Sequence, residues 1–74
     1  MYYVYVLENR NSEFYTGYCS DLRKRLREHK SGKVFATKAK LPIELIYYEA
    51  CLNKYDAVKR EKYLKSGPGK RYLK

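Results

Sequence analysis

Two short runs of aromatic and β-branched residues near the start of the chain constrain the fold most. Residues 2–7 are rich in tyrosine and valine, which suit the pleated surface of a strand. Polar residues 8–12 then provide turn chemistry, and residues 14–18 form the second run. The sequence therefore predicts a β-hairpin, with Gly17 at a point where the backbone passes close to another group.

The remaining chain predicts two helices around a third strand. Ser20-Asp21 supplies a cap before a helix over 22–31, and Gly32 ends that helix. Residues 33–42 lack periodicity and predict a basic loop, whereas residues 43–51 predict a strand. Asn53 and Asp56 form a capping pair for a helix that runs to about residue 65 and ends at the Gly-Pro-Gly of 67–69. The order β-β-α-β-α predicts an α+β domain with helices on a mostly antiparallel sheet.

Chain length and charge narrow the functions that such a domain can have. A chain of 74 residues allows one domain, residues 1–74, with a small core, so we expect a shallow cleft or face as the site. The net charge of +9 favours a phosphate-bearing partner, DNA or RNA. We expect nucleic-acid contacts from Arg23, Arg27, Lys33, Lys38, Lys65, Lys70 and Arg71.

Cysteine usage and hydropathy address the cellular setting. Two cysteines without CxxC spacing do not make a disulfide scaffold, and we expect Cys19 and Cys51 to be small buried side chains. The apolar run at residues 2–7 is too short for a signal peptide or a membrane span. The chain is therefore expected to be cytoplasmic, with no membrane partner.

Helical geometry directs two polar side chains of the first helix toward the sheet. At about 100° per residue, Leu22 and Leu26 define the apolar stripe, His29 falls inside it, and Arg25 borders it. The other basic residues of this helix lie further round, on a solvated face. Two interpretations of Arg25 stay open, a functional one and a side chain that lies along the stripe and pairs with a carboxylate.

The second helix places a carboxylate in its apolar stripe. Ala57, Val58 and Leu64 define the inner face, and Glu61 falls within it. An unpaired charge there is unfavourable, so Glu61 needs a cation, a donor or a metal. It either pairs with Arg25 or Lys65, or binds a hard divalent ion that prefers oxygen ligands.

The strand residues divide between the two faces of the sheet. Alternation places Tyr3, Tyr5 and Leu7 on one face of the first strand, and Tyr2, Val4 and Val6 on the other. In the third strand we expect both Tyr47 and Tyr48 to pack in the core. Glu49 beside them is either a pairing partner or a charge at the sheet edge.

These residues together resemble a known family. Tyr3-Val4-Tyr5 and Tyr15-Thr16-Gly17 look like the paired signature of the GIY-YIG endonuclease superfamily. The similarity covers nearly the whole chain and is closest to small single-domain bacterial members related to the N-terminal nuclease domain of the bacterial excinuclease. It also includes these flanking residues: Asp21, Leu22, Arg25, Leu26, His29, Thr37, Pro42, Ala57, Glu61 and Lys65.

The resemblance implies a three-stranded antiparallel sheet flanked by helices and a metal-dependent endonuclease that cuts DNA in repair or processing. Tyr5 and Tyr15 would be paired phenols at the cleft, one of them acting as or helping a general base, or orienting the attacking water. Arg25 would stabilise charge on the phosphate, and His29 would assist proton transfer or position a neighbour. Glu61 would hold one divalent ion, Mg²⁺ or Mn²⁺.

Two further expectations follow from the resemblance. A tyrosine has a pKa of about 10, so Tyr5 or Tyr15 becomes a useful base only where nearby cations favour the phenolate. Several relatives carry an asparagine downstream of the metal-binding glutamate, whereas the asparagines here all precede Glu61. The alternatives are therefore a nucleic-acid-binding module with weak catalysis, and an adaptor that needs a protein partner for its specificity. A metal-independent ribonuclease is a further alternative.

Overall fold

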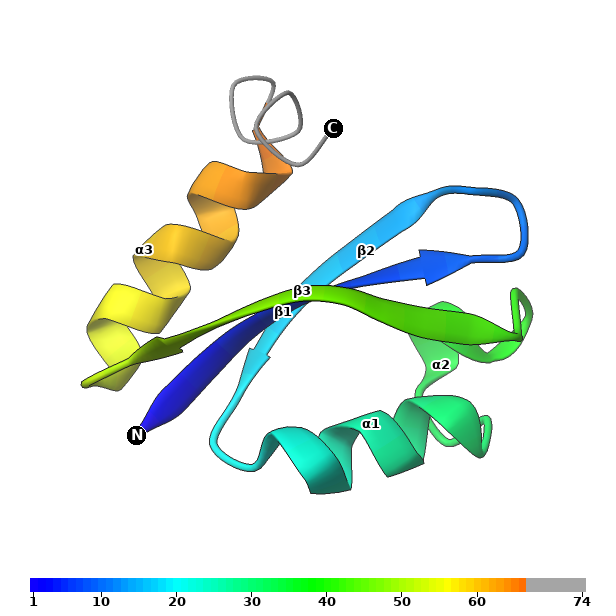
Figure 1. The fold of residues 1–74 in the computed structure, drawn as a ribbon, viewed down its shortest axis with the longest axis horizontal. Helices are drawn as coiled ribbons and strands as arrows, with labels where there is room; N and C mark the ends of the chain where they lie inside the picture. Colours follow the sequence, from blue (N-terminus) through cyan, green and yellow to red (C-terminus); the bar gives the residue numbers. More distant parts are fainter. Residues whose placement is uncertain (67–74) are drawn as a thin grey trace.

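The computed structural model describes residues 1–66, which form a three-stranded antiparallel sheet with helices on both faces (Figure 1). Its strands, in the spatial order β2-β1-β3, are β1 Tyr2–Asn9, β2 Phe14–Cys19 and β3 Ile43–Cys51. The helices are α1 Leu22–Lys30, the one-turn α2 Phe35–Lys38, and α3 Lys54–Lys65. The predicted α+β class and the order β-β-α-β-α are confirmed, with α2 as an addition. No helix in the described residues has the length and apolar character to cross a membrane.

The two faces of the sheet carry separate hydrophobic clusters. Val4 and Val6 of β1 pack with Ala57 and Leu64 of α3 on one face. On the other face Tyr5, Leu7 and Ile43 form a cluster that is completed by partly buried side chains, including Leu22 and Leu26 of α1. The predicted division of β1 between two faces is therefore confirmed, and α1 and α3 lie on opposite sides of the sheet (Figure 1).

Local hydrogen bonds begin and end the long helices where the sequence predicts. The Asp21 carboxylate accepts from the Lys24 backbone N–H at the start of α1, and the Asn53 amide oxygen accepts from that of Asp56 at the start of α3. Gly32 follows α1 with a φ of 80°, a conformation that glycine adopts without strain. The predicted Gly-Pro-Gly end at 67–69 lies outside the described residues.

Three boundaries differ from the sequence prediction. β1 continues through Glu8 and Asn9, which were expected in the turn, because they pair with neighbouring strands. The expected loop over 33–42 contains α2, which is closed by the Lys38 N–H donating to the Val34 carbonyl. Four residues are too few to show a helical period. α1 ends at Lys30, one residue earlier than expected, and Ser31 caps it.

Side chains on the outer strands are more exposed than expected. Tyr47 packs against the cluster beneath α3, as expected, but Tyr48 is 56% exposed and does not pack in the core. Cys19 and Cys51 are free thiols and only half-buried. All three lie on β2 or β3, the edge strands, where one side of each residue has no neighbouring strand.

Candidate active site

A hydrogen-bonded network connects α1 with the middle of β1. Tyr5 is almost completely buried, and its hydroxyl lies 2.9 Å from Nε2 of His29. The Arg25 Nε–H donates to the same hydroxyl at 3.4 Å. The remaining basic residues of α1 are exposed. The prediction that Arg25 and His29 alone among them face the sheet is therefore confirmed.

Thr37 of α2 holds the other side of the imidazole. Its hydroxyl lies 2.7 Å from His29 Nδ1, and both residues are buried. Burial, and then the charge of Arg25, lower the pKa of His29, so the ring is neutral at pH 7 and donates from one nitrogen only. All four groups are satisfied when Arg25 donates to Tyr5, Tyr5 donates to Nε2, and Nδ1–H donates to Thr37. Helical periodicity assigns no role to Thr37, since a one-turn helix shows no period.

Gly17 makes room for the Tyr5 phenol. A Cβ at residue 17 would lie 2.7 Å from the Tyr5 hydroxyl oxygen and 2.8 Å from its ring carbon Cζ. The same atom would lie 3.3 Å from Cε1 of Tyr15. The predicted close approach at this glycine is confirmed, and the approaching group is the phenol at the centre of the network.

Tyr15 lies beside this network on the edge strand β2. Its ring centroid is 5.2 Å from that of His29, edge to face, and 6.4 Å from that of Tyr5. The structure brings the two signature tyrosines to one place, but with unequal surroundings. Burial raises the pKa of Tyr5 to about 12, the opposite direction from the one that a phenolate base needs. Tyr15 is only half-buried, and its hydroxyl has no hydrogen-bond partner among the described residues.

Arg25 combines the two interpretations that its helical position left open. Its Nη1 pairs with Glu28 at 3.2 Å, and its Nε contacts Tyr5. The side chain is nevertheless 38% exposed. Because a guanidinium carries five N–H donors, Arg25 can bind an anion while keeping both partners.

Glu61 lies on α3, on the opposite side of the sheet from α1. Its side chain is 17% exposed, and Oε2 is 3.5 Å from the Lys65 ammonium one turn later. The predicted pairing with Lys65 is therefore observed, and the pairing with Arg25 is not. Among the residues described, no hydrogen bond or ion pair connects Glu61 with the network around Tyr5.

Comparison with known proteins agrees with this arrangement. The model of the GIY-YIG catalytic domain matches residues 1–72. The chain belongs to the GIY-YIG family. It is 45% identical over 64 residues to a UPF0213 protein of Streptococcus pneumoniae serotype 4, and this match covers 85% of the chain and 65% of the relative. It is 34% identical over 74 residues to a UPF0213 protein of Staphylococcus saprophyticus, with 99% and 90% covered.

A solved structure is also similar to this GIY-YIG domain. The solution NMR structure of a UPF0213 protein from Bacillus halodurans matches with a TM-score of 0.61 and 35% identity. The match covers 99% of this chain and 82% of that one. In contrast, the chain spans only about 65% of the length of the pneumococcal relative.

A divalent ion fits this GIY-YIG domain only through Glu61. No three His, Cys, Asp or Glu side chains within residues 1–66 gather closely enough to form a complete metal site. A hard cation such as Mg²⁺ does not need one, because it binds through one or two carboxylates and keeps water or phosphate oxygens as its other ligands. The half-buried Glu61 carboxylate fits that donor type, with Lys65 as a competing cation.

The basic residues expected to contact nucleic acid are spread over several elements. Those within the described part of the chain are exposed, and Lys70 and Arg71 lie outside it. The exposed ones are Arg23, Arg27, Lys33, Lys38 and Lys65.

An ion pair that the sequence did not assign fixes α3 on the sheet. Arg60 binds both carboxylate oxygens of Glu49 through Nε, at 2.9 and 3.0 Å, and Tyr47 donates to the same carboxylate. Burial alone would raise the pKa of Glu49, but the hydrogen bonds from Arg60 and Tyr47 outweigh it and hold that pKa below its usual range. Glu49 is therefore a pairing partner, and the residue after Arg60 is the candidate metal ligand Glu61.

Proposed function

We propose that this GIY-YIG domain is a divalent-metal-dependent endonuclease that hydrolyses DNA phosphodiester bonds in repair or processing. The observation that supports this function most is the convergence of Arg25, His29 and Thr37 on the buried hydroxyl of Tyr5. A structural core of this size has little need for four interlinked polar side chains, because apolar residues would stabilise it as well. The network orients a cation and a neutral imidazole beside Tyr15.

The proposed roles follow from the surroundings of each group. Arg25 donates to the oxygens of the scissile phosphate, where negative charge develops during hydrolysis. Tyr15 contacts the attacking water or the phosphate, because its hydroxyl is unoccupied among the described residues. Tyr5 positions Arg25 and His29, since its raised pKa keeps it protonated.

His29 and Glu61 complete the set. His29 is neutral and hydrogen-bonded at both nitrogens, so it passes a proton along the chain from Tyr5 to Thr37 or holds Tyr5 in place. Glu61 holds the divalent ion, which supplies positive charge to the phosphate oxygens when bound. We place the protein in the cytoplasm, with DNA as substrate and a protein partner as a source of specificity.

A cleavage assay tests this function. The substrates are labelled duplex, branched and single-stranded DNA and RNA, each with Mg²⁺, Mn²⁺ or EDTA. Glu61→Gln removes the charge at nearly constant shape, and Glu44→Gln makes the same change at an exposed residue of β3. We expect cutting that EDTA and Glu61→Gln abolish and that Glu44→Gln preserves. Cutting that survives EDTA overturns metal dependence and favours the ribonuclease alternative if RNA is the substrate.

A second function is favoured by the position of Glu61. Its pairing with Lys65, on the other side of the sheet from Arg25, is compatible with a nucleic-acid-binding module of weak catalytic power. Such a module binds DNA equally well with and without the Glu61 carboxylate and cuts no substrate in any metal. Cutting that appears only after addition of cell extract indicates an adaptor that needs a partner.

A further inference from the structure

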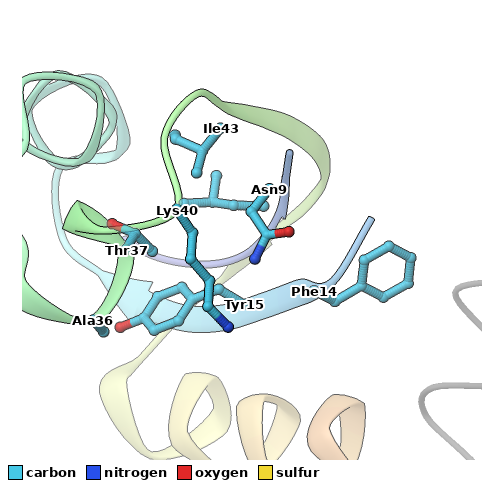
Figure 2. A pocket seen from close by; sticks show the side chains of 8 residues that line it. Asn9, Phe14, Tyr15, Ala36, Thr37, Lys40 and Ile43 are labelled. Atoms are coloured by element: carbon cyan, nitrogen blue, oxygen red, sulfur yellow. The ribbon is translucent and has the colours of Figure 1, made fainter. Parts of the chain in front are cut away.

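A small pocket adjoins the candidate site and shares two of its residues. Tyr15 and Thr37 line it together with Asn9 and Lys40, over an apolar floor that includes Leu7 and Ile43. In Figure 2 the Lys40 side chain extends from the segment between α2 and β3 across this pocket toward β2. A ligand in the pocket would therefore lie between the catalytic candidates and one cationic side chain that has no role in the network around Tyr5.

The size of the pocket limits what it can hold. Its volume is about 100 Å³. This equals the liquid volume of roughly three water molecules. A phosphate group fits such a space with part of its hydration, whereas a purine base with its sugar is too large. Lys40 supplies the charge that an anion needs, and the Asn9 amide is a further polar group in the lining.

Glu13 holds Lys40 in the structure, through a contact that an anion can replace. The Lys40 ammonium lies 2.7 Å from Oε1 of Glu13, and the two side chains are 47% and 54% exposed. Solvent and salt screen such an exposed pair.

The two members of this pair differ in how firmly they are placed. Glu13 accepts from the Asn9 amide at 3.2 Å, and its backbone N–H donates to the Asn9 side-chain oxygen at 3.1 Å. The carboxylate is therefore attached to the hairpin turn. The Lys40 ammonium is on a flexible stem with three donors, so it can turn toward a ligand in the pocket.

We propose that this pocket is a phosphate subsite, in which Lys40 binds a phosphate of the nucleic-acid strand next to the scissile one and Glu13 competes with it for Lys40. The inference rests on the proposed function, because it takes the ligand to be the strand that is cut beside Tyr15. Glu13 keeps the ammonium directed toward the pocket in the free protein and is displaced when the strand binds.

The proposal assigns opposite effects to the two members of one ion pair. Lys40→Gln raises the Kd for DNA about three- to tenfold and lowers the slope of log K against log salt by about 1. Glu13→Gln lowers the Kd, because it removes the competitor. A pair that only stabilises the fold would act in the same direction from both sides. In the Lys40→Gln background, Glu13→Gln no longer improves binding, since there is no ammonium to release.

The experiment measures binding of a fluorescein-labelled duplex and a single-stranded oligonucleotide by anisotropy, in EDTA and over a range of salt. Lys54→Gln and Glu44→Gln are the matched controls, because they make the same charge changes at exposed residues that do not line the pocket. Lys40→Arg keeps the charge and is expected to bind as the wild type does. Thermal unfolding of each variant confirms that it is folded.

Equal effects of Lys40→Gln and Lys54→Gln on the Kd overturn the subsite, as does a gain from Glu13→Gln that persists without Lys40. If these signs are as expected but no variant cuts DNA, the subsite is supported and the proposed cleavage fails. If cleavage is observed while Lys40→Gln behaves as its control, the subsite alone fails. A wild type that binds neither oligonucleotide overturns both.

Discussion

Replacing Gly17 by alanine tests whether the space at this residue, and not its backbone freedom, is what the site requires. The φ of Gly17 is not in the left-handed region, in contrast to that of Gly32. In an unstrained strand position, Gly→Ala stabilises a protein by about 0.4–1 kcal/mol through the unfolded state. Here the new Cβ would lie 2.7 Å from the Tyr5 hydroxyl oxygen, and ordinary contact begins at 3.4 Å. The phenol must therefore withdraw by about 0.7 Å, the difference between these distances.

That displacement is large for a buried hydrogen bond. N···O distances span only about 2.7–3.2 Å, so a shift of this size exceeds the whole range. The Tyr5 hydroxyl is 2.9 Å from His29, which is completely buried and cannot exchange its partner for water. Overpacking of a core costs about 1–3 kcal/mol. We therefore expect Gly17→Ala to destabilise the fold by about 1–3 kcal/mol, opposite in sign to the ordinary effect.

Urea unfolding measures the free-energy change, and ¹⁵N NMR of the His29 ring reports the hydrogen bond to Tyr5. Gly32→Ala is the control. It forces alanine into a left-handed conformation at a residue where the added Cβ meets only the end of the Leu41 side chain, at 3.7 Å. We expect Gly32→Ala to lower stability without moving the His29 signals, and Gly17→Ala to change both. A Gly17→Ala protein that is as stable as the wild type, with unchanged His29 signals and cleavage, would refute the reasoning.

Three further predictions concern pH. Because the pKa of Tyr5 is raised to about 12, the unfolded chain loses its proton first, and about 2–3 kcal/mol of stability is lost as pH rises from 10 to 12. Urea unfolding should show this loss in the wild type and a smaller one in Tyr5→Phe. The lowered pKa of His29 means that stability decreases as pH falls below about 6.5. An NMR titration that gives His29 an ordinary pKa contradicts this. The lowered pKa of Glu49 makes the stabilisation by Arg60 complete above about pH 4.3 and lost as pH falls through the folded value. Glu49→Gln should reduce that acid dependence, whereas Glu44→Gln should not.

The elements that sequence predicted well are those with a local cause. Asp21 and Asn53 each cap a helix through a hydrogen bond to a backbone N–H three residues later. Such contacts depend on spacing alone and can be read from the chain. The direction of Arg25 and His29 was predictable for a similar reason, because the period of a helix relates them to Leu22 and Leu26 without any knowledge of the rest of the fold.

Tyr47 and Tyr48 show what alternation cannot predict. Neighbouring strand residues point to opposite faces, so one of the two faces α3 and the other faces the side of α1. Whether a helix extends far enough to cover the edge strand depends on where it sits on the sheet. Tyr47 is covered and Tyr48 is 56% exposed. The contact of Thr37 with His29 was beyond prediction for the same reason, because it depends on how the segment after α1 folds back.

The position of Glu61 carries this distinction to the mechanism. Periodicity directs Glu61 and His29 alike toward the sheet, but it does not say toward which face, and the two helices pack on opposite faces. A strand of DNA that meets both groups must therefore pass along the edge of the sheet. β2 is the edge strand that contacts α3 and also carries Tyr15, whereas β3 lies on the far side of β1. The proposed metal site thus requires cleavage to occur at the edge of β2. A photoreactive group on the scissile phosphate should then attach to β2 and α1 and leave β3 unmodified, and attachment to β3 would exclude Glu61 as the ligand of a metal that acts at the same phosphate.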